Sequence, residues 1–151
     1  MVVSSRGRPH QAVHGGKESG VLSEELKAAV DRPVFAVVAT IQPDGSCQQS
    51  VVWITRDGED LLFSTTIGRR KERNLRRDPR VNVLINPAEA PYTYAEVRGT
   101  ATLTTEGGQE LIDALSHKYT GKAYAEFNPA SKDDAERVVV RITARKVVGA
   151  L

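Results

Sequence analysis

A cluster of basic side chains at 68–80 (GRRKERNLRRDPR) is the part of this sequence with the clearest chemical potential. It holds seven of the chain's 21 lysines and arginines, and its only acids are Glu72 and Asp78. The hydroxyl-bearing run 64–66 (Ser-Thr-Thr) comes just before it. Hydroxyl donors, N–H groups at a helix start and arginine forks are the groups that bind phosphates and carboxylates. The pattern predicts an anion site where a strand turns into a helix at Gly68.

Two other interpretations of this cluster stay open from the residues alone. The arginines could form a solvated cationic face whose aliphatic stems cover the protein. Binding of nucleic acid is less favoured, because such segments usually interleave aromatic residues with the charges and this one has none. The net charge of only +2 also gives no support to a general nucleic-acid binder.

Residues that carry chemistry by themselves are scarce elsewhere. The sequence has no Walker A, GxGxxG, HExxH or GxSxG motif. His10, His14 and His117 are too scattered to predict a metal site, and Cys47 is interpreted as a small packed side chain. No pair of acids suggests an acid/base couple. An enzyme of this kind would depend on a bound cofactor for its chemistry.

Composition predicts an ordinary globular protein of 151 residues, with 40% hydrophobic and 26% charged residues. The segment 1–20 is expected to be a flexible tail, and 21–151 a single domain. No apolar run is long enough to cross a membrane, and the start lacks the apolar region of a secretory signal. With a single cysteine, these features predict a cytoplasmic protein without membrane partners.

The first half of the chain is predicted to form a helix and three strands. Ser23 is expected to cap a helix that ends at Asp31. The β-branched run 34–41 predicts a strand buried on both faces, and 47–55 and 60–66 predict two more, joined by tight turns into an antiparallel meander. Trp53, within the second of these strands, is either a core residue, which we favour, or part of a wall that binds a ring.

The second half predicts a helix at 69–77, a strand at 80–85 and a loop at 86–91. A strand at 94–104 follows, with a possible bulge at Gly99, and then a helix at 107–119 with Leu111, Ile112 and Leu115 on its apolar face. After an irregular connection at 120–135, the last strand covers 137–143 and runs on towards Val148. Six mostly antiparallel strands favour a closed or partly closed barrel, with a two-layer α+β sandwich as the alternative.

The segments 34–54, 63–85 and 92–104, in this order and spacing, resemble the flavin and deazaflavin oxidoreductases of the pyridoxamine-phosphate-oxidase-like superfamily. The most specific piece is the run RNLRRDPR at 73–80, which follows Lys71. Within the superfamily the chain is most similar to the actinobacterial branch that uses coenzyme F420, an 8-hydroxy-5-deazaflavin. The resemblance implies a mainly β, six-stranded antiparallel split barrel with short peripheral helices. It also implies a homodimer with cofactor sites at the interface.

The same resemblance implies which residues bind the cofactor. Ser64, Arg69 and Lys71 match the positions that hold its phosphate in this family. The full set of expected cofactor-binding residues is Gln48, Ser50, Trp53, Ser64, Thr65, Thr66, Arg69, Arg70, Lys71 and Tyr92. Tyr94 is a candidate proton donor, and the two tyrosines lie where aromatic residues can approach the site from this chain or its partner.

The length of the basic cluster favours one of two candidate cofactors over the other. FMN carries one phosphate, whereas F420 carries a phosphodiester followed by several glutamate carboxylates, which suits seven basic residues better. We therefore expect an F420-dependent reductase that transfers hydride to an unsaturated or conjugated organic substrate. An FMN-binding oxidase-like protein and a non-enzymatic cofactor-binding or basic-surface module are the alternatives. No Arg-x-His motif follows the last strand, so the pyridoxamine phosphate oxidase reaction itself is not expected.

Overall fold

The computed structural model describes residues 22–151, and the expected tail at 1–20 lies outside the described residues. The helices are α1 (Glu24–Asp31), α2 (Arg70–Arg77), α3 (Gly108–Thr120) and α4 (Tyr124–Phe127), with a 3₁₀-helix η1 (Pro129–Asp133). The strands are β1 (Phe35–Ile41), β2 (Cys47–Trp53), β3 (Thr55–Asp57), β4 (Asp60–Thr66), β5 (Arg80–Ile85), β6 (Ala95–Thr104) and β7 (Arg137–Gly149).

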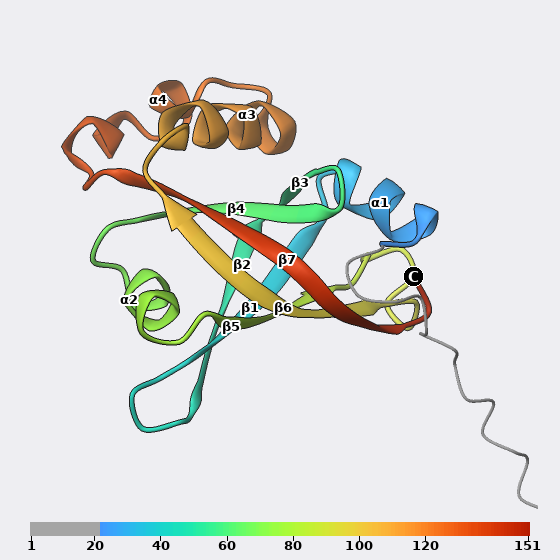
Figure 1. Ribbon diagram of the computed structural model, residues 1–151. Coiled ribbons are helices and arrows are strands. Elements are labelled where there is room, and N and C mark those ends of the chain that lie inside the picture. Colours follow the sequence, from blue (N-terminus) through green and yellow to red (C-terminus); the bar gives the residue numbers. More distant parts are fainter. Residues whose placement is uncertain (1–21) are drawn as a thin grey trace, which may run out of the picture.

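These seven strands form one antiparallel sheet in the order β2-β1-β5-β6-β7-β4-β3. The sheet is strongly curled, so that β2 at one end contacts β4 near the other. Helices α3 and α4 lie together over one end of the curled sheet, whereas α2 lies to its side (Figure 1). The expected mainly β split barrel with peripheral helices is therefore confirmed.

Three details differ from the sequence prediction. The predicted strand 47–55 divides at Ile54 into β2 and β3, which gives seven strands instead of six. The predicted meander holds only in part: the predicted second strand pairs with β1 through β2 and with β4 through the short β3, and the other neighbour of β4 is β7. The burial of β1 on both faces is also wrong: its even-numbered residues are buried, but Phe35 is 59% exposed. A curled sheet encloses only its inner face, so the outer face of β1 stays accessible.

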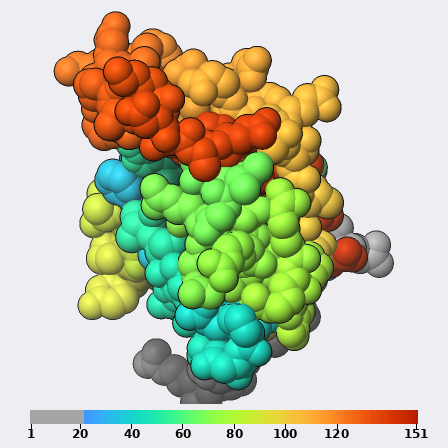
Figure 2. Space-filling model, turned by 90° about the vertical axis from the view of Figure 1, so that its left-hand side faces the viewer, coloured from blue at the N-terminus to red at the C-terminus, as the bar shows by residue number. Residues whose placement is uncertain are grey.

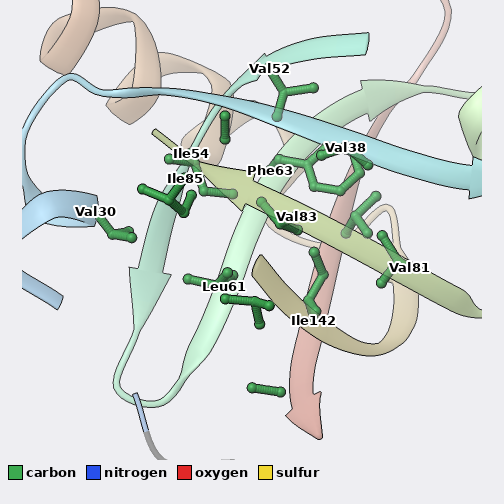
Figure 3. Packing of buried hydrophobic residues seen from close by; sticks show 14 of the residues in the cluster. Val30, Val38, Val52, Ile54, Leu61, Phe63, Val81, Val83, Ile85 and Ile142 are labelled. Carbon is green, nitrogen blue, oxygen red and sulfur yellow. The ribbon is translucent and has the colours of Figure 1, made fainter. Parts of the chain in front are cut away.

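The core fills the inside of this curl. Phe63 of β4 is fully buried and lies among apolar side chains from several strands, including Val38 of β1 and Val83 of β5 (Figure 3). Val30 of α1 joins the same cluster and covers one side of it. Because the core uses one face of each strand, the opposite faces remain free to form a site.

A close backbone contact inside the sheet leaves no room for a side chain at Gly99. The register of β6 against β7 shifts between Arg98 and Gly99, as the predicted bulge requires. A Cβ atom at Gly99 would lie 2.3 Å from the backbone oxygen of Thr143, which cannot move without breaking the ladder. We expect Gly99→Ala to lower the free energy of unfolding by about 1 to 3 kcal/mol. Urea titration, with the exposed Thr102→Ala as the control, checks this; equal midpoints would contradict it.

Candidate functional site

A cavity of about 310 Å³ lies between the end of β4, the start of α2 and helices α3 and α4. Figure 2 shows this side of the molecule, with the orange-red segment that includes α4 directly above the green segment that includes α2. The cavity is lined by Phe35, Val51, Val52, Trp53, Ser64, Thr65, Arg69, Lys71, Ile112, Leu115, Tyr124, Phe127 and Arg137. The lining therefore combines hydroxyl-bearing and basic side chains with apolar and aromatic ones.

Two hydroxyl groups of the lining residues lack hydrogen-bond partners. The oxygens Ser64 Oγ and Thr65 Oγ1 are buried, and neither has a partner among the described residues. Buried polar atoms in folded proteins are almost always hydrogen-bonded, so an orphaned pair beside a cavity marks a place where a ligand can complete the bonding. As hydroxyls they can donate to an anionic oxygen.

Two cations also line the cavity. Arg69 and Lys71 line it, and neither forms an ion pair within the part of the chain that the structure describes. Burial lowers the pKa of Lys71 below its ordinary value, and the charge of Arg69 lowers it further. An anion in the cavity would offset both effects, so the two cations, with the hydroxyl groups of the lining, supply donors of the kind that a phosphate accepts.

A buried carboxylate fixes the turn that carries these cations. Glu72 is only 3% exposed, and its carboxylate accepts a hydrogen bond from the Gly68 N–H at 3.0 Å and pairs with Arg76. Gly68 has φ of 90°, a left-handed conformation that favours glycine. Burial alone would raise the pKa of Glu72, but the bonds from Arg76 and Gly68 outweigh it and hold that pKa below its ordinary value. Glu72 is therefore charged at neutral pH and holds the turn.

Helix α2 is also tied to β1 by a buried amide. Asn74 Nδ2 donates to Thr40 Oγ1 at 3.0 Å, and Arg77 donates to the carbonyl of Ile41 and to Asn74 Oδ1. Leu75 adds apolar contact with the core. Arg77 thus helps to attach the helix to β1, and Arg76 pairs with Glu72 of the same helix, whereas Arg69 and Lys71 at its start line the cavity.

Aromatic rings form the apolar wall. The Trp53 ring lies 5.3 Å from the Phe127 ring, centroid to centroid, and is stacked at 5.4 Å on Tyr119 of α3. Phe35, opposite Trp53 in the ladder, continues this wall. The interpretation of Trp53 as a core residue is therefore wrong: it sits at the last position of β2, on the outer face of the curl, and is only partly buried. Such a wall suits a flat, conjugated ring.

Comparison with known proteins agrees with this geometry. A family model described as pyridoxamine 5'-phosphate oxidase matches residues 22–149. The chain belongs to this family. The family is one of oxidoreductases.

Among solved structures, the chain is similar to an F420 reductase, with 30% identity and a TM-score of 0.73 over 84% of this chain and 98% of that one. It is also similar to a conserved hypothetical protein from Mycobacterium tuberculosis, with 29% identity and a TM-score of 0.68 over 85% of this chain and 84% of that one. General stress protein 26 from Bacillus anthracis, at 18% identity, shares the fold, with a TM-score of 0.59 over 82% of this chain and 89% of that one.

The structure brings together half of the residues expected to bind a cofactor. The cavity is lined by Trp53, Ser64, Thr65, Arg69 and Lys71. It is not lined by Gln48, Ser50, Thr66, Arg70, Tyr92 or Tyr94. Gln48 instead hydrogen-bonds to Thr40, and Ser50 Oγ is buried without a partner among the described residues. Tyr92 is 92% exposed and Tyr94 is 42% exposed, so neither belongs to the cavity within this chain.

Sequence reasoning missed the lining that comes from the second half of the chain. Arg137 pairs with Thr66 across β4 and β7, and its guanidinium donates to Tyr124 Oη at 2.6 Å while also pairing with Asp134. Tyr124 and Phe127 belong to α4, in a segment expected to be irregular. Only the long-range pairing of β7 with β4 brings these residues to the site, and no local pattern reports that pairing.

The orphaned hydroxyls yield a prediction that separates function from stability. Changing Ser64→Ala and Thr65→Val together removes two unpaired buried oxygens, so the free protein is expected to be at least as stable as the wild type. The same change removes two donors and should weaken an anionic ligand about tenfold or more, at about 1 kcal/mol for each hydrogen bond. Thermal unfolding and ligand titration measure the two effects. A loss of stability without a loss of binding would show that the hydroxyls serve the fold.

Within residues 22–151, no helix is both long and apolar enough to span a membrane. No group of three or more histidine, cysteine or acidic side chains in the same range is arranged to hold a metal ion. The cavity at the end of β4 is thus the best candidate for chemistry in the described part of the chain.

Proposed function

We propose that the protein is an oxidoreductase that binds coenzyme F420 in this cavity and reduces an unsaturated or conjugated organic substrate. The observation that carries the proposal is the mixed lining of the cavity, in which two orphaned hydroxyls and two unpaired cations occur together with an aromatic wall. A cofactor with a flat ring and an anionic tail has the same two-part character. The deazaflavin ring, when bound, would supply the hydride.

The polar and the aromatic lining residues would bind different parts of the cofactor. Ser64, Thr65, Arg69 and Lys71 would hold the phosphate through charge-assisted hydrogen bonds. Trp53 and Phe35 would cover the ring and exclude water from it. Arg137 adds a third cation to the lining, with its guanidinium already oriented by Tyr124.

Free cations beyond the cavity favour F420 over FMN. Arg70 and Arg73 are exposed, and neither side chain has an ion pair or hydrogen bond with any described residue. Arg76 and Arg77, in contrast, are engaged by Glu72 and by the carbonyl of Ile41. Arg70 and Arg73 are therefore available to the carboxylates of a long tail, which FMN lacks. The similarity to an F420 reductase supports the same cofactor.

We also propose a homodimer, since the outer face of the sheet exposes apolar side chains. Val51 is 65% exposed, Phe35 59% and Phe127 50%. A second subunit that covers this face would enclose the ring-binding end and bring residues such as Tyr92 or Tyr94 to the site from the partner. Light scattering during dilution measures the oligomeric state, and a monomer at micromolar concentration would contradict this part of the proposal.

The single cysteine is compatible with a cytoplasmic enzyme.

Titration of the purified protein with F420 and with FMN, followed by cofactor absorbance, tests the proposal. We expect micromolar affinity for F420 and affinity for FMN that is about tenfold weaker, a difference of about 1.4 kcal/mol. Arg70→Ala with Arg73→Ala should weaken F420 without affecting FMN, whereas the control Arg145→Ala should change neither. Tight copurified FMN would favour the FMN-binding alternative. Failure to bind either cofactor, with salt-dependent binding of DNA, would favour a basic-surface module.

A further inference from the structure

Tyr119, near the end of α3, lies behind the aromatic wall and is not part of the cavity lining. Its ring is stacked on Trp53, with 5.4 Å between centroids and 11° between planes, and lies 5.6 Å from the ring of Phe35. Tyr119 therefore contacts both cross-strand partners that present rings to the cavity.

The hydroxyl of Tyr119 sits where the ladder of β1 and β2 ends. The register pairs Phe35 with Trp53, so the next opposed residues would be Val34 and Ile54. Those two residues are not joined directly: Tyr119 Oη accepts from the Ile54 N–H at 3.1 Å and donates to the Val34 carbonyl. The hydroxyl thus replaces a ladder hydrogen bond and separates the two strands next to Phe35 and Trp53.

The adjacent lysine strengthens this connection. Lys118 Nζ donates to the Ile54 carbonyl at 2.7 Å and to the Val30 carbonyl, and it lies 5.3 Å from the centroid of the Tyr119 ring. Burial raises the pKa of Tyr119 above its ordinary value, so its hydroxyl is protonated and can donate. The last turn of α3 therefore holds the point where β2 gives way to β3.

We propose that Tyr119 is a positioning residue that sets the orientation of Trp53 and the separation of Phe35 from it, and so determines how well a flat ring fits the cavity. The hydroxyl keeps β1 and β2 apart, and the ring supports Trp53 from behind. Its effect on a bound ring rests on the proposed function, whereas its effect on Trp53 does not.

The chain contains one tryptophan and four tyrosines, so fluorescence excited at the long-wavelength edge of indole absorption, where tyrosine does not absorb, reports on Trp53 alone. In the unliganded protein, Tyr119→Phe and Tyr119→Leu are expected to shift the emission maximum of Trp53 to the red and to increase its quenching by acrylamide, more for leucine than for phenylalanine. The exposed His117→Ala, two residues away on α3, is the control and should match the wild type. Unchanged emission and quenching in both Tyr119 variants would overturn the proposal, whatever cofactor the protein binds.

A double-mutant cycle distinguishes positioning from general stability. Tyr119→Phe should weaken F420 about three- to tenfold, as expected when one aromatic contact is displaced, and leave competition by inorganic pyrophosphate unchanged. In a Trp53→Ala background the same change should have almost no further effect on F420. Equal losses in both backgrounds would contradict a role through Trp53. If F420 does not bind the wild type, the proposed function fails, and the fluorescence comparison still decides the role of Tyr119.

Discussion

Changing Arg69→Ala together with Lys71→Ala is expected to weaken cofactor binding about 100-fold or more. Each change removes a charge-assisted hydrogen bond, for which about 1.5 to 3 kcal/mol is typical, and 1.4 kcal/mol corresponds to a factor of ten. Neither side chain has an ion pair among the described residues, so their loss should leave the fold intact. Equilibrium titration with F420 measures the effect.

The control for this pair is Arg98→Ala, since Arg98 lies on β6 and pairs with Glu96 away from the cavity. The affinity of that variant should equal the wild-type affinity. Higher ionic strength should reduce the difference between the wild type and the double variant, because part of the attraction is screened. If the double variant binds as tightly as the wild type, the anion site lies elsewhere.

Changing Glu72→Leu is expected to lower the free energy of unfolding by about 3 kcal/mol. The carboxylate accepts from Gly68 N–H and pairs with Arg76, and hydrogen bonds to charged groups typically contribute about 1.5 to 3 kcal/mol each. Loss of these bonds also releases the turn that carries Arg69, so cofactor affinity should fall together with stability. Urea denaturation at pH 7 measures the first effect, with the exposed Glu106→Leu as the control.

The pH dependence provides a second check on Glu72. Its pKa in the folded protein lies below the ordinary value of 4.5, so its stabilising contribution is complete above that value and is lost as pH falls through the folded pKa. Glu72→Gln should therefore be less stable than the wild type at pH 7, and the difference should shrink below about pH 4. A difference that stays constant from pH 7 to pH 3 would show that the charge of Glu72 does not contribute.

The basic cluster shows how much of the site follows from sequence. Hydroxyls at the end of a strand, a glycine and then arginines predict an anion site from local chemistry alone, and Ser64, Thr65, Arg69 and Lys71 do line one cavity. The pattern could not show which of the later arginines are free and which are bonded within the protein. That difference depends on the buried Glu72, which pairs with Arg76, and on the carbonyl of Ile41 in β1, which accepts from Arg77. Those partners become visible only once α2 is packed against the sheet.

The strands were predictable where local patterns are strong and unpredictable where pairing is long-range. A run of β-branched residues located β1, alternation located β5, a preceding turn located β4, and Gly99 marked a real bulge. The break at Ile54 carries no local signal, since it depends on Lys118 and Tyr119, which lie 64 and 65 residues away in sequence. Arg137 and α4, which complete the wall of the cavity, also lie far in sequence from the residues that they contact there, so the sequence did not predict their place in it.

Quenching of Trp53 by a bound cofactor tests most directly whether the cavity holds both the ring and the phosphate. Trp53 is the only tryptophan and lines the same cavity as the proposed phosphate donors. Titration with F420 is predicted to give saturable quenching of Trp53, with the same midpoint as cofactor absorbance, and Arg69→Ala with Lys71→Ala should move both midpoints together. Binding of F420 that leaves Trp53 fluorescence unchanged would contradict the assignment of this cavity as the cofactor site.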